Sequence, residues 1–134
     1  ATVFVPIIRR LPIKVLYPSG ENQEINTPKY EKTFKQADII AGDFLFIKKY
    51  LPLSIDGKII VTNTVTPQDI ELLRNRGAKM LVTSTPELDG RSFGTNVMEA
   101  LACVLIGKKP EEVTPNEYFN VIDQDFFTHR VVYF

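Results

Sequence analysis

Short runs of consecutive apolar residues alternate along the chain with segments whose apolar residues recur every three to four positions. Residues 58–62 and 79–83 are rich in β-branched and aliphatic side chains, a pattern typical of buried strands. Between them, Thr66 and Pro67 introduce a predicted helix that ends at Gly77. A strand, a helix and a second apolar strand predict a unit with parallel strands and a right-handed crossover.

Further elements are expected on both sides of this unit. Upstream, Thr27 before Pro28 predicts the start of a helix over residues 27–37, followed by a buried strand over residues 38–43 and helical turns over residues 44–51. Downstream, the pattern predicts a helix over residues 95–106 capped by Thr95 or Asn96, a short helix introduced by the capping-box sequence TPNE at 114–117, and a strand within residues 126–134.

These elements predict an α/β fold with a three-layer, mainly parallel sheet flanked by helices on both faces. The expected strand order is 38–43, 58–62 and 79–83, and the absence of polar alternation in the last two strands favours cover on both sides. A weak internal repeat supports the unit, because residues 60–64 (IVTNT) match residues 81–85 (LVTST). Residues 1–134 are expected to form one domain, or a fragment of a larger Rossmann-like domain.

The first part of the chain is its most apolar stretch. Residues 2–16 (TVFVPIIRRLPIKVL) are interrupted by Arg9 and Arg10 and by two prolines. They are too short and too charged for a transmembrane helix, and they lack the basic head and cleavage site of a signal peptide. We expect a buried strand or short helix of a core here, and the alternative is that the chain enters in the middle of a larger domain.

Composition narrows the classes of function. The 134 residues are 44% apolar and carry no formal net charge, which excludes a disordered tail and argues against binding to a nucleic-acid backbone. The single cysteine, Cys103, excludes a disulfide framework, lies among apolar neighbours and suits a reducing cytoplasm. No metal-ligand spacing occurs, and the sole histidine, His129, has no serine or cysteine partner in a local motif.

Small polar residues follow each predicted parallel strand. These are Asp43, Asn63, Thr64, Ser84 and Thr85. Because ligands of open parallel sheets bind outside the carboxyl ends of the strands, these residues are candidates for binding a cofactor. The alternative is that they cap helices and close turns, which small polar residues also do at such places.

A second candidate is the loop that precedes the helix over residues 95–106. Its sequence DGRSFGTN offers Arg91, Ser92, Gly94, Thr95 and Asn96 beside a helix N-terminus. Exposed amides, a guanidinium and hydroxyls together suit a phosphate or a carboxylate. Neither of the two common phosphate-loop motifs, G-x-G-x-x-G and G-x-x-x-x-G-K-[ST], is present.

Several segments resemble one known family. These are YPSGENQEINTPKY, ADIIAGDFLFIKKYLP, IIVTNTVTPQDIELLRNRGAKMLVTSTPELDGRSFGTNVMEA and EEVTPNEYF. They are similar to the C-terminal part of uncharacterised bacterial proteins described as quinate/shikimate 5-dehydrogenase-like, and GRSFGTN is the most specific portion. The resemblance implies the second half of a nucleotide-binding Rossmann-type domain, with NAD or NADP as cofactor. It carries over no catalytic residue, because the lysine–aspartate substrate pair and the Asn-Arg-Thr stretch of authentic enzymes are missing.

Three functional hypotheses follow. The first is the C-terminal half of a dinucleotide-binding, dehydrogenase-like protein; the second is a non-catalytic module for a small anion or metabolite; the third is a self-associating structural domain. The expected partners are a small-molecule or nucleotide ligand and a second copy of the chain, or missing upstream sequence, docking near residues 126–134. No nucleic acid, membrane or metal is expected.

Overall fold

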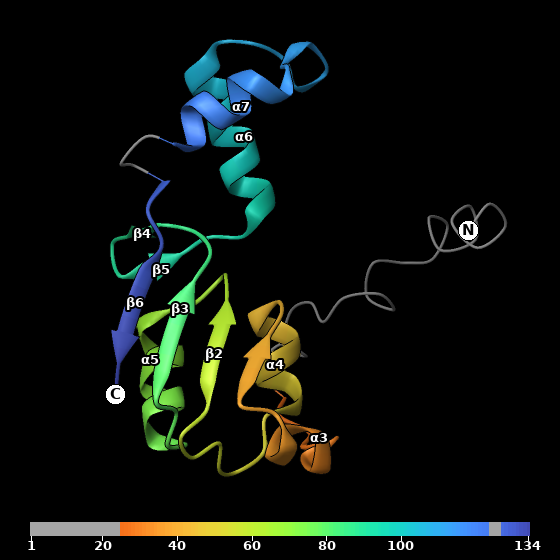
Figure 1. Ribbon diagram of the computed structural model, residues 1–134, viewed down its shortest axis with the longest axis vertical. Helices are drawn as coiled ribbons and strands as arrows, with labels where there is room; N and C mark the ends of the chain where they lie inside the picture. The colour runs from red at the N-terminus through yellow and green to blue at the C-terminus, as the bar shows by residue number, and fades with distance from the viewer. Residues whose placement is uncertain (1–24, 124–126) are drawn as a thin grey trace, which may run out of the picture.

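The computed structural model describes residues 25–123 and 127–134 (Figure 1). Residues 2–16, for which a buried strand or helix is predicted, lie outside this range. The described elements are, in chain order, α3 (Glu31–Gln36), β1 (Ile39–Ala41), α4 (Phe44–Tyr50), β2 (Ile59–Thr62), α5 (Pro67–Asn75), β3 (Met80–Thr83), β4 (Glu87–Leu88), β5 (Arg91–Ser92), α6 (Thr95–Ile106), the 3₁₀ helix η2 (Pro110–Glu112), α7 (Pro115–Ile122) and β6 (Arg130–Tyr133).

The principal sheet is mainly parallel, with strand order β1-β2-β3-β6. The first three strands run in the same direction, so that Ile40 pairs with Ile60 and Ile60 with Leu81. The last strand, β6, is antiparallel to β3 and places Val132 opposite Leu81. The predicted α/β class, the parallel pairing and the order of the first three strands are therefore confirmed.

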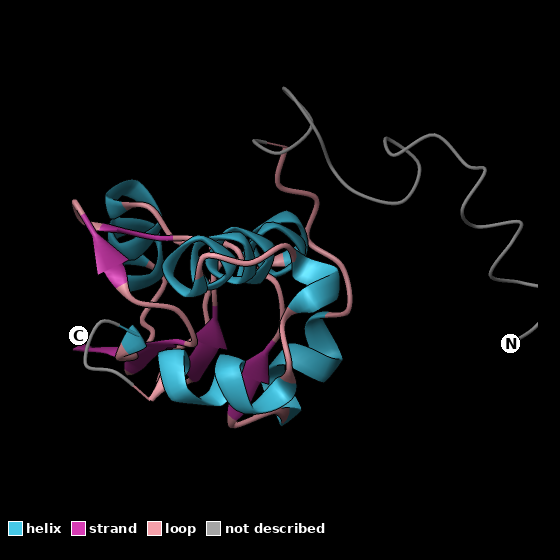
Figure 2. Ribbon diagram, turned by 90° about the horizontal axis from the view of Figure 1, so that it is seen from above, coloured by secondary structure: helices cyan, strands magenta, loops and turns pink. Residues whose placement is uncertain are grey.

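One face of this sheet carries the core. Ile60 and Leu81 are fully buried on this face. They belong to one core cluster with Phe44 at the start of α4, Leu51 just after α4 and Leu73 in α5. Because burying one such side chain contributes about 1.5–3 kcal/mol, this contact between two helices and a sheet is the main source of stability. Figure 2 shows the strands and the helices near them from above.

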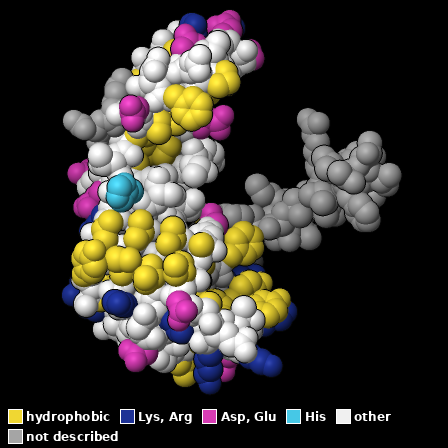
Figure 3. All heavy atoms as spheres, in the orientation of Figure 1, with side chains coloured by type: hydrophobic (Ala, Val, Ile, Leu, Met, Phe, Trp, Pro, Cys, Tyr) yellow, Lys and Arg dark blue, Asp and Glu magenta, His cyan; other side chains and the backbone are white. Residues whose placement is uncertain are grey.

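The opposite face of the sheet is bare in the described part of the chain, and we call it the open face. It consists of alternate residues of all four strands: Ile39, Ala41, Ile59, Val61, Met80, Val82, Val131 and Tyr133. Their side chains are partly or largely exposed, whereas their neighbours Ile60 and Leu81 are not. Figure 3 shows them as an ordered apolar patch facing the viewer.

The predicted three-layer arrangement with helices on both faces is therefore wrong for the described residues. The reason lies in crossover handedness. Both crossovers, through α4 and through α5, step in the same direction across the sheet, and right-handed connections that step the same way place their helices on the same face. Only a reversal of strand order would bring a helix to the other side.

Two helices, α5 and α7, begin where their local capping signals predict. Thr66 and Asp69 form a complete capping box at the start of α5, and Gly77 follows that helix with a φ of 82° in the left-handed region. Thr114 and Glu117 form the predicted capping box of α7. The hydrogen bond from Lys108, with Nζ 2.5 Å from Oε1, and those from Thr114 lower the pKa of Glu117 to about 2.

Two predicted caps are wrong. The helix predicted from Thr27 begins at Glu31, because the Thr27 amide donates instead to Lys49 O. The N-cap of α6 is Gly94, not Thr95 or Asn96.

Candidate functional site

The carboxyl ends of the parallel strands border a cleft of about 740 Å³. It is lined by Asp43 after β1, by Asn63, Thr64 and Thr66 after β2, and by residues 91–97 from β5 and the start of α6. Two groups of residues that the sequence predicted separately therefore lie in one cleft. Figure 1 shows why: the β4–β5 hairpin and the start of α6 lie just beyond the tips of β2 and β3.

Asp43 serves as a helix cap at the cleft. It is the N-cap of α4, and its Oδ1 accepts a hydrogen bond from the Leu45 amide at 2.9 Å. Asp43 therefore has a local structural role, as a helix cap and not only as the turn residue after Gly42, and its carboxylate also contributes to the lining.

Asn63 and Thr64 form the turn that leaves β2. Thr64 has a φ of 54°, and its hydroxyl donates to Asn63 Oδ1 at 3.0 Å. A positive φ is uncommon for a β-branched residue and costs on the order of 1 kcal/mol or more. The surrounding contacts therefore hold this turn in a strained conformation at the cleft wall.

Ser92 has a structural role. Its side chain is buried, its Oγ accepts from the Val65 amide at 2.9 Å, and its own amide donates to Val65 O at 2.9 Å. These two bonds fasten β5 to the loop between β2 and α5, so the predicted anion ligand Ser92 shapes the cleft by holding its two walls together.

The start of α6 faces the cleft without a side-chain cap. Its N-cap, Gly94, has no side chain that could accept from the first amides of the helix. One local bond reaches the first turn, from the Val97 amide to Asn96 Oδ1 at 3.0 Å. A Cβ atom at residue 94 would lie 2.8 Å from Asn96 Oδ1, so the Asn96 side chain would have to move to make room for it. The first amides of a helix lack intrahelical acceptors and attract anions.

Arg91 is the cation of the cleft. Its side chain is exposed, and within residues 25–123 and 127–134 its guanidinium makes no hydrogen bond or ion pair. The neighbouring Arg130, by contrast, is held by Glu87 Oε2 at 2.9 Å. Arg91 therefore has its five donors available at the cleft, next to the uncapped start of α6.

Ser84 and Thr85 lie in a different cavity from the other predicted cofactor residues. This second cavity measures about 360 Å³ and lies between the end of β3 and the α6–α7 pair. Thr85 is buried, and its hydroxyl donates to Phe93 O at 2.7 Å, so it acts structurally. Thr95 lines both cavities.

The remaining titratable candidates do not form a catalytic constellation. Cys103 is buried, and its Sγ lies 3.1 Å from Tyr118 Oη; this hydrogen bond and burial raise the pKa of Tyr118 to about 12. His129 is exposed at the end of the open face (Figure 3). Among the described residues, no group of three histidine, cysteine or acidic side chains is placed to hold a metal ion.

Sequence reasoning missed several lining residues. Thr66 was recognised only as a cap, and Phe93 and Val97 were not considered. The second cavity uses Tyr118 and Phe127, which lie far along the chain from Ser84 and Thr85, so no local signal could have found it.

The fold and the cleft define a mainly parallel α/β protein with a candidate ligand site at the carboxyl edge of its sheet. The chain belongs to the family described as "Domain of unknown function (DUF8754)", whose model matches residues 1–134. No curated protein and no solved structure is significantly similar to it. No helix among the described residues has the length and apolar character needed to cross a bilayer.

Proposed function

We propose that this protein binds a small molecule bearing a phosphate or a carboxylate group in the cleft at the carboxyl edge of the sheet. One observation carries the proposal: the available guanidinium of Arg91 and the uncapped first turn of α6 border the same cleft. A guanidinium and helix amides are complementary to the charge and geometry of such an anion.

Within this class, a nucleotide is the ligand that the topology favours. Three parallel strands joined by helices on one face resemble half of a Rossmann-like sheet, in which ligands lie beyond the carboxyl ends. NAD and NADP are the particular cofactors that the resemblance to quinate/shikimate 5-dehydrogenase-like proteins implies. An oxidoreductase activity would need a catalytic pair that we do not identify, so the proposal is one of binding.

Isothermal titration of the full chain with inorganic phosphate, ADP, NAD and NADP tests this proposal. We expect the phosphate-bearing ligands to bind, and Arg91→Ala to weaken binding by about tenfold or more, because a charge-assisted hydrogen bond contributes about 1.5–3 kcal/mol. Arg74→Ala is the matched control, because it removes the same side chain from the last turn of α5, outside the lining of the cleft. Failure of all four ligands to bind, or equal affinities for Arg91→Ala and the native chain, would refute the proposal.

A second candidate function is self-association, and the open face of the sheet favours it. All eight of its residues are apolar, and patches of this kind on monomeric proteins mark interaction sites. We infer that its partner is a second copy of the chain related by a two-fold axis. Two such faces, each about four strands wide and four residues long, cover about 500 Å² together, so a specific dimer would also need contacts from residues around the open face.

Sedimentation velocity tests this second candidate. The native chain is expected to sediment as a dimer at micromolar concentrations, and Val131→Lys as a monomer, because a lysine in the middle of an apolar contact is desolvated without a partner. Val104→Lys, at a 74% exposed position on α6, should leave the dimer intact. A native chain that sediments as a monomer would contradict the proposal. If a shortened chain starting at residue 17 then formed dimers, the segment 2–16 would be what covers the open face in the native chain.

A further inference from the structure

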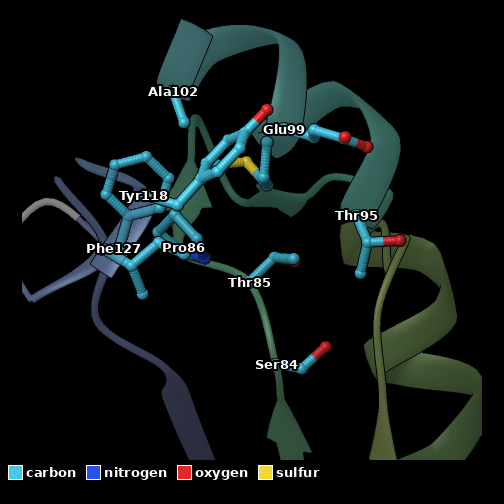
Figure 4. A pocket seen from close by; sticks show the side chains of 10 residues that line it. Ser84, Thr85, Pro86, Thr95, Glu99, Ala102, Tyr118 and Phe127 are labelled. Atoms are coloured by element: carbon cyan, nitrogen blue, oxygen red, sulfur yellow. The ribbon is translucent and has the colours of Figure 1, made fainter. Parts of the chain in front are cut away.

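The second cavity has a mostly apolar lining. Its walls come from Pro86 after β3, from Met98 and Ala102 on α6, and from the rings of Tyr118 and Phe127. Figure 4 shows these side chains around a common space, with Tyr118, Pro86 and Phe127 on one side and Ser84, Thr95 and Glu99 on the other. Ligand pockets typically have this composition, an apolar wall with a few polar groups.

The size of the cavity limits what it can hold. A dry apolar cavity of about 150 Å³ accepts a benzene molecule. The cavity of about 360 Å³ therefore has room for a ring with substituents, but not for a large cofactor.

One wall of this cavity is fixed in advance. The Tyr118 hydroxyl is held by Cys103 Sγ at 3.1 Å, which orients the phenol ring toward the cavity before any ligand arrives. A fixed ring loses little conformational entropy on binding. Aromatic rings favour flat apolar groups, which they contact in offset-stacked or edge-to-face geometry.

Charge distinguishes the two cavities. Glu99 is the charged side chain of the second cavity, whereas the first holds Arg91 and Asp43 together with the amides of α6. Asp43 Oδ1 already accepts from the Leu45 amide as the cap of α4, so Arg91 and the α6 amides are the groups that suit an anion. An acidic group would be repelled by Glu99 and attracted by Arg91. The first cavity therefore suits the anionic part of a ligand and the second suits an uncharged part.

Thr95 connects the two cavities, since it lines both at the first residue of α6. We propose that the two cavities form one bipartite site for an amphipathic anion, an inference that rests on the proposed function. Its phosphate or carboxylate lies in the cleft at Arg91, and an uncharged aromatic or branched aliphatic group passes Thr95 into the second cavity.

Isothermal titration with phenyl phosphate, inorganic phosphate and phenol tests the bipartite site in the full chain. We expect phenyl phosphate to bind at least about tenfold more tightly than inorganic phosphate, because burial of the ring adds to the affinity of the anion. Arg91→Ala should weaken the binding of phenyl phosphate and of inorganic phosphate by similar factors.

Substitutions in the second cavity should act on the ring alone. Ala102→Phe fills the cavity, and Ile122→Asp places a charge at its wall at a 51% exposed position that folding tolerates. Both substitutions should lower the affinity for phenyl phosphate to that for inorganic phosphate, and both should leave the affinity for inorganic phosphate unchanged. The matched control Val104→Asp, on α6 outside both cavities, should change neither.

The outcomes separate this inference from the proposed function. Equal affinities for phosphate and phenyl phosphate would overturn the bipartite site while the anion site stands. Binding of phenyl phosphate that is insensitive to Arg91→Ala but lost in Ile122→Asp would overturn both, because the second cavity would then act without an anion site.

Discussion

Replacing Leu81 with alanine is expected to lower the free energy of unfolding by about 2–5 kcal/mol. Leu81 is fully buried in the inner strand β3, where it meets the core residues of α4 and α5. Alanine there loses the transfer free energy of the deleted carbons and leaves a cavity under both helices. Urea denaturation followed by circular dichroism measures the change, with an unaltered m-value as the sign that the same surface unfolds.

Leu53→Ala is the matched control for this substitution. It is the same chemical change at a position that is 80% exposed, and we expect an effect below about 0.5 kcal/mol. Similar losses for Leu81→Ala and Leu53→Ala would mean that the covered face of the sheet is not the core.

Replacing Asp69 with alanine is expected to cost about 3 kcal/mol. The Asp69 carboxylate is buried; it accepts from the Thr66 amide at 3.1 Å and from the Thr66 hydroxyl at 2.8 Å, and it pairs with Lys48 Nζ at 3.1 Å. Its loss removes the carboxylate half of the capping box of α5, while the Thr66 hydroxyl can still accept from the residue 69 amide, and it removes the ion pair that joins α5 to α4. Thermal and urea unfolding of the variant measure the combined effect.

Two further variants divide this effect. Asp69→Asn keeps an oxygen that can cap the helix and removes the charge, so the remaining loss reports the ion pair with Lys48. Glu71→Ala, on the same helix, breaks only an exposed pair with Arg74 and should cost less than about 0.5 kcal/mol. If Asp69→Ala were as mild as Glu71→Ala, the buried carboxylate would not hold the two helices together.

The parallel pair β2–β3 could be predicted because its information is local. Residues 58–62 and 79–83 are apolar throughout, and Thr66 with Pro67 and Gly77 mark the ends of the helix between them. Capping boxes and left-handed glycines lie within a few residues of the backbone groups that they satisfy, so the sequence specifies them directly.

The start of α3 could not be predicted in the same way. Thr27 and Pro28 have the form of a helix start, but Asn26 donates to Lys48 O and Leu51 O, and the Thr27 amide donates to Lys49 O. These contacts with α4 hold the segment in an extended form, and the helix begins only after Tyr30, whose φ is 62°. Tertiary hydrogen bonds therefore overrode a local capping signal.

The candidate site was predicted in pieces. Asp43 and Asn63 were expected together because parallel strands end at the same edge, and Arg91 was expected at a helix N-terminus. Their meeting in one cleft depends on the β4–β5 hairpin and on the bonds between Ser92 and Val65, which span a sequence separation of 27 residues. Such contacts leave no periodic pattern in the sequence.

The strand β1 has a consequence for aggregation. Within the described residues it pairs only with β2, and so it forms an edge whose outer amides and carbonyls are not used by the sheet. It is three residues long, and its neighbours Gly42 and Asp43 turn away into α4. An edge strand this short offers an incoming strand few hydrogen bonds, which limits fibril-like growth of the sheet from that edge.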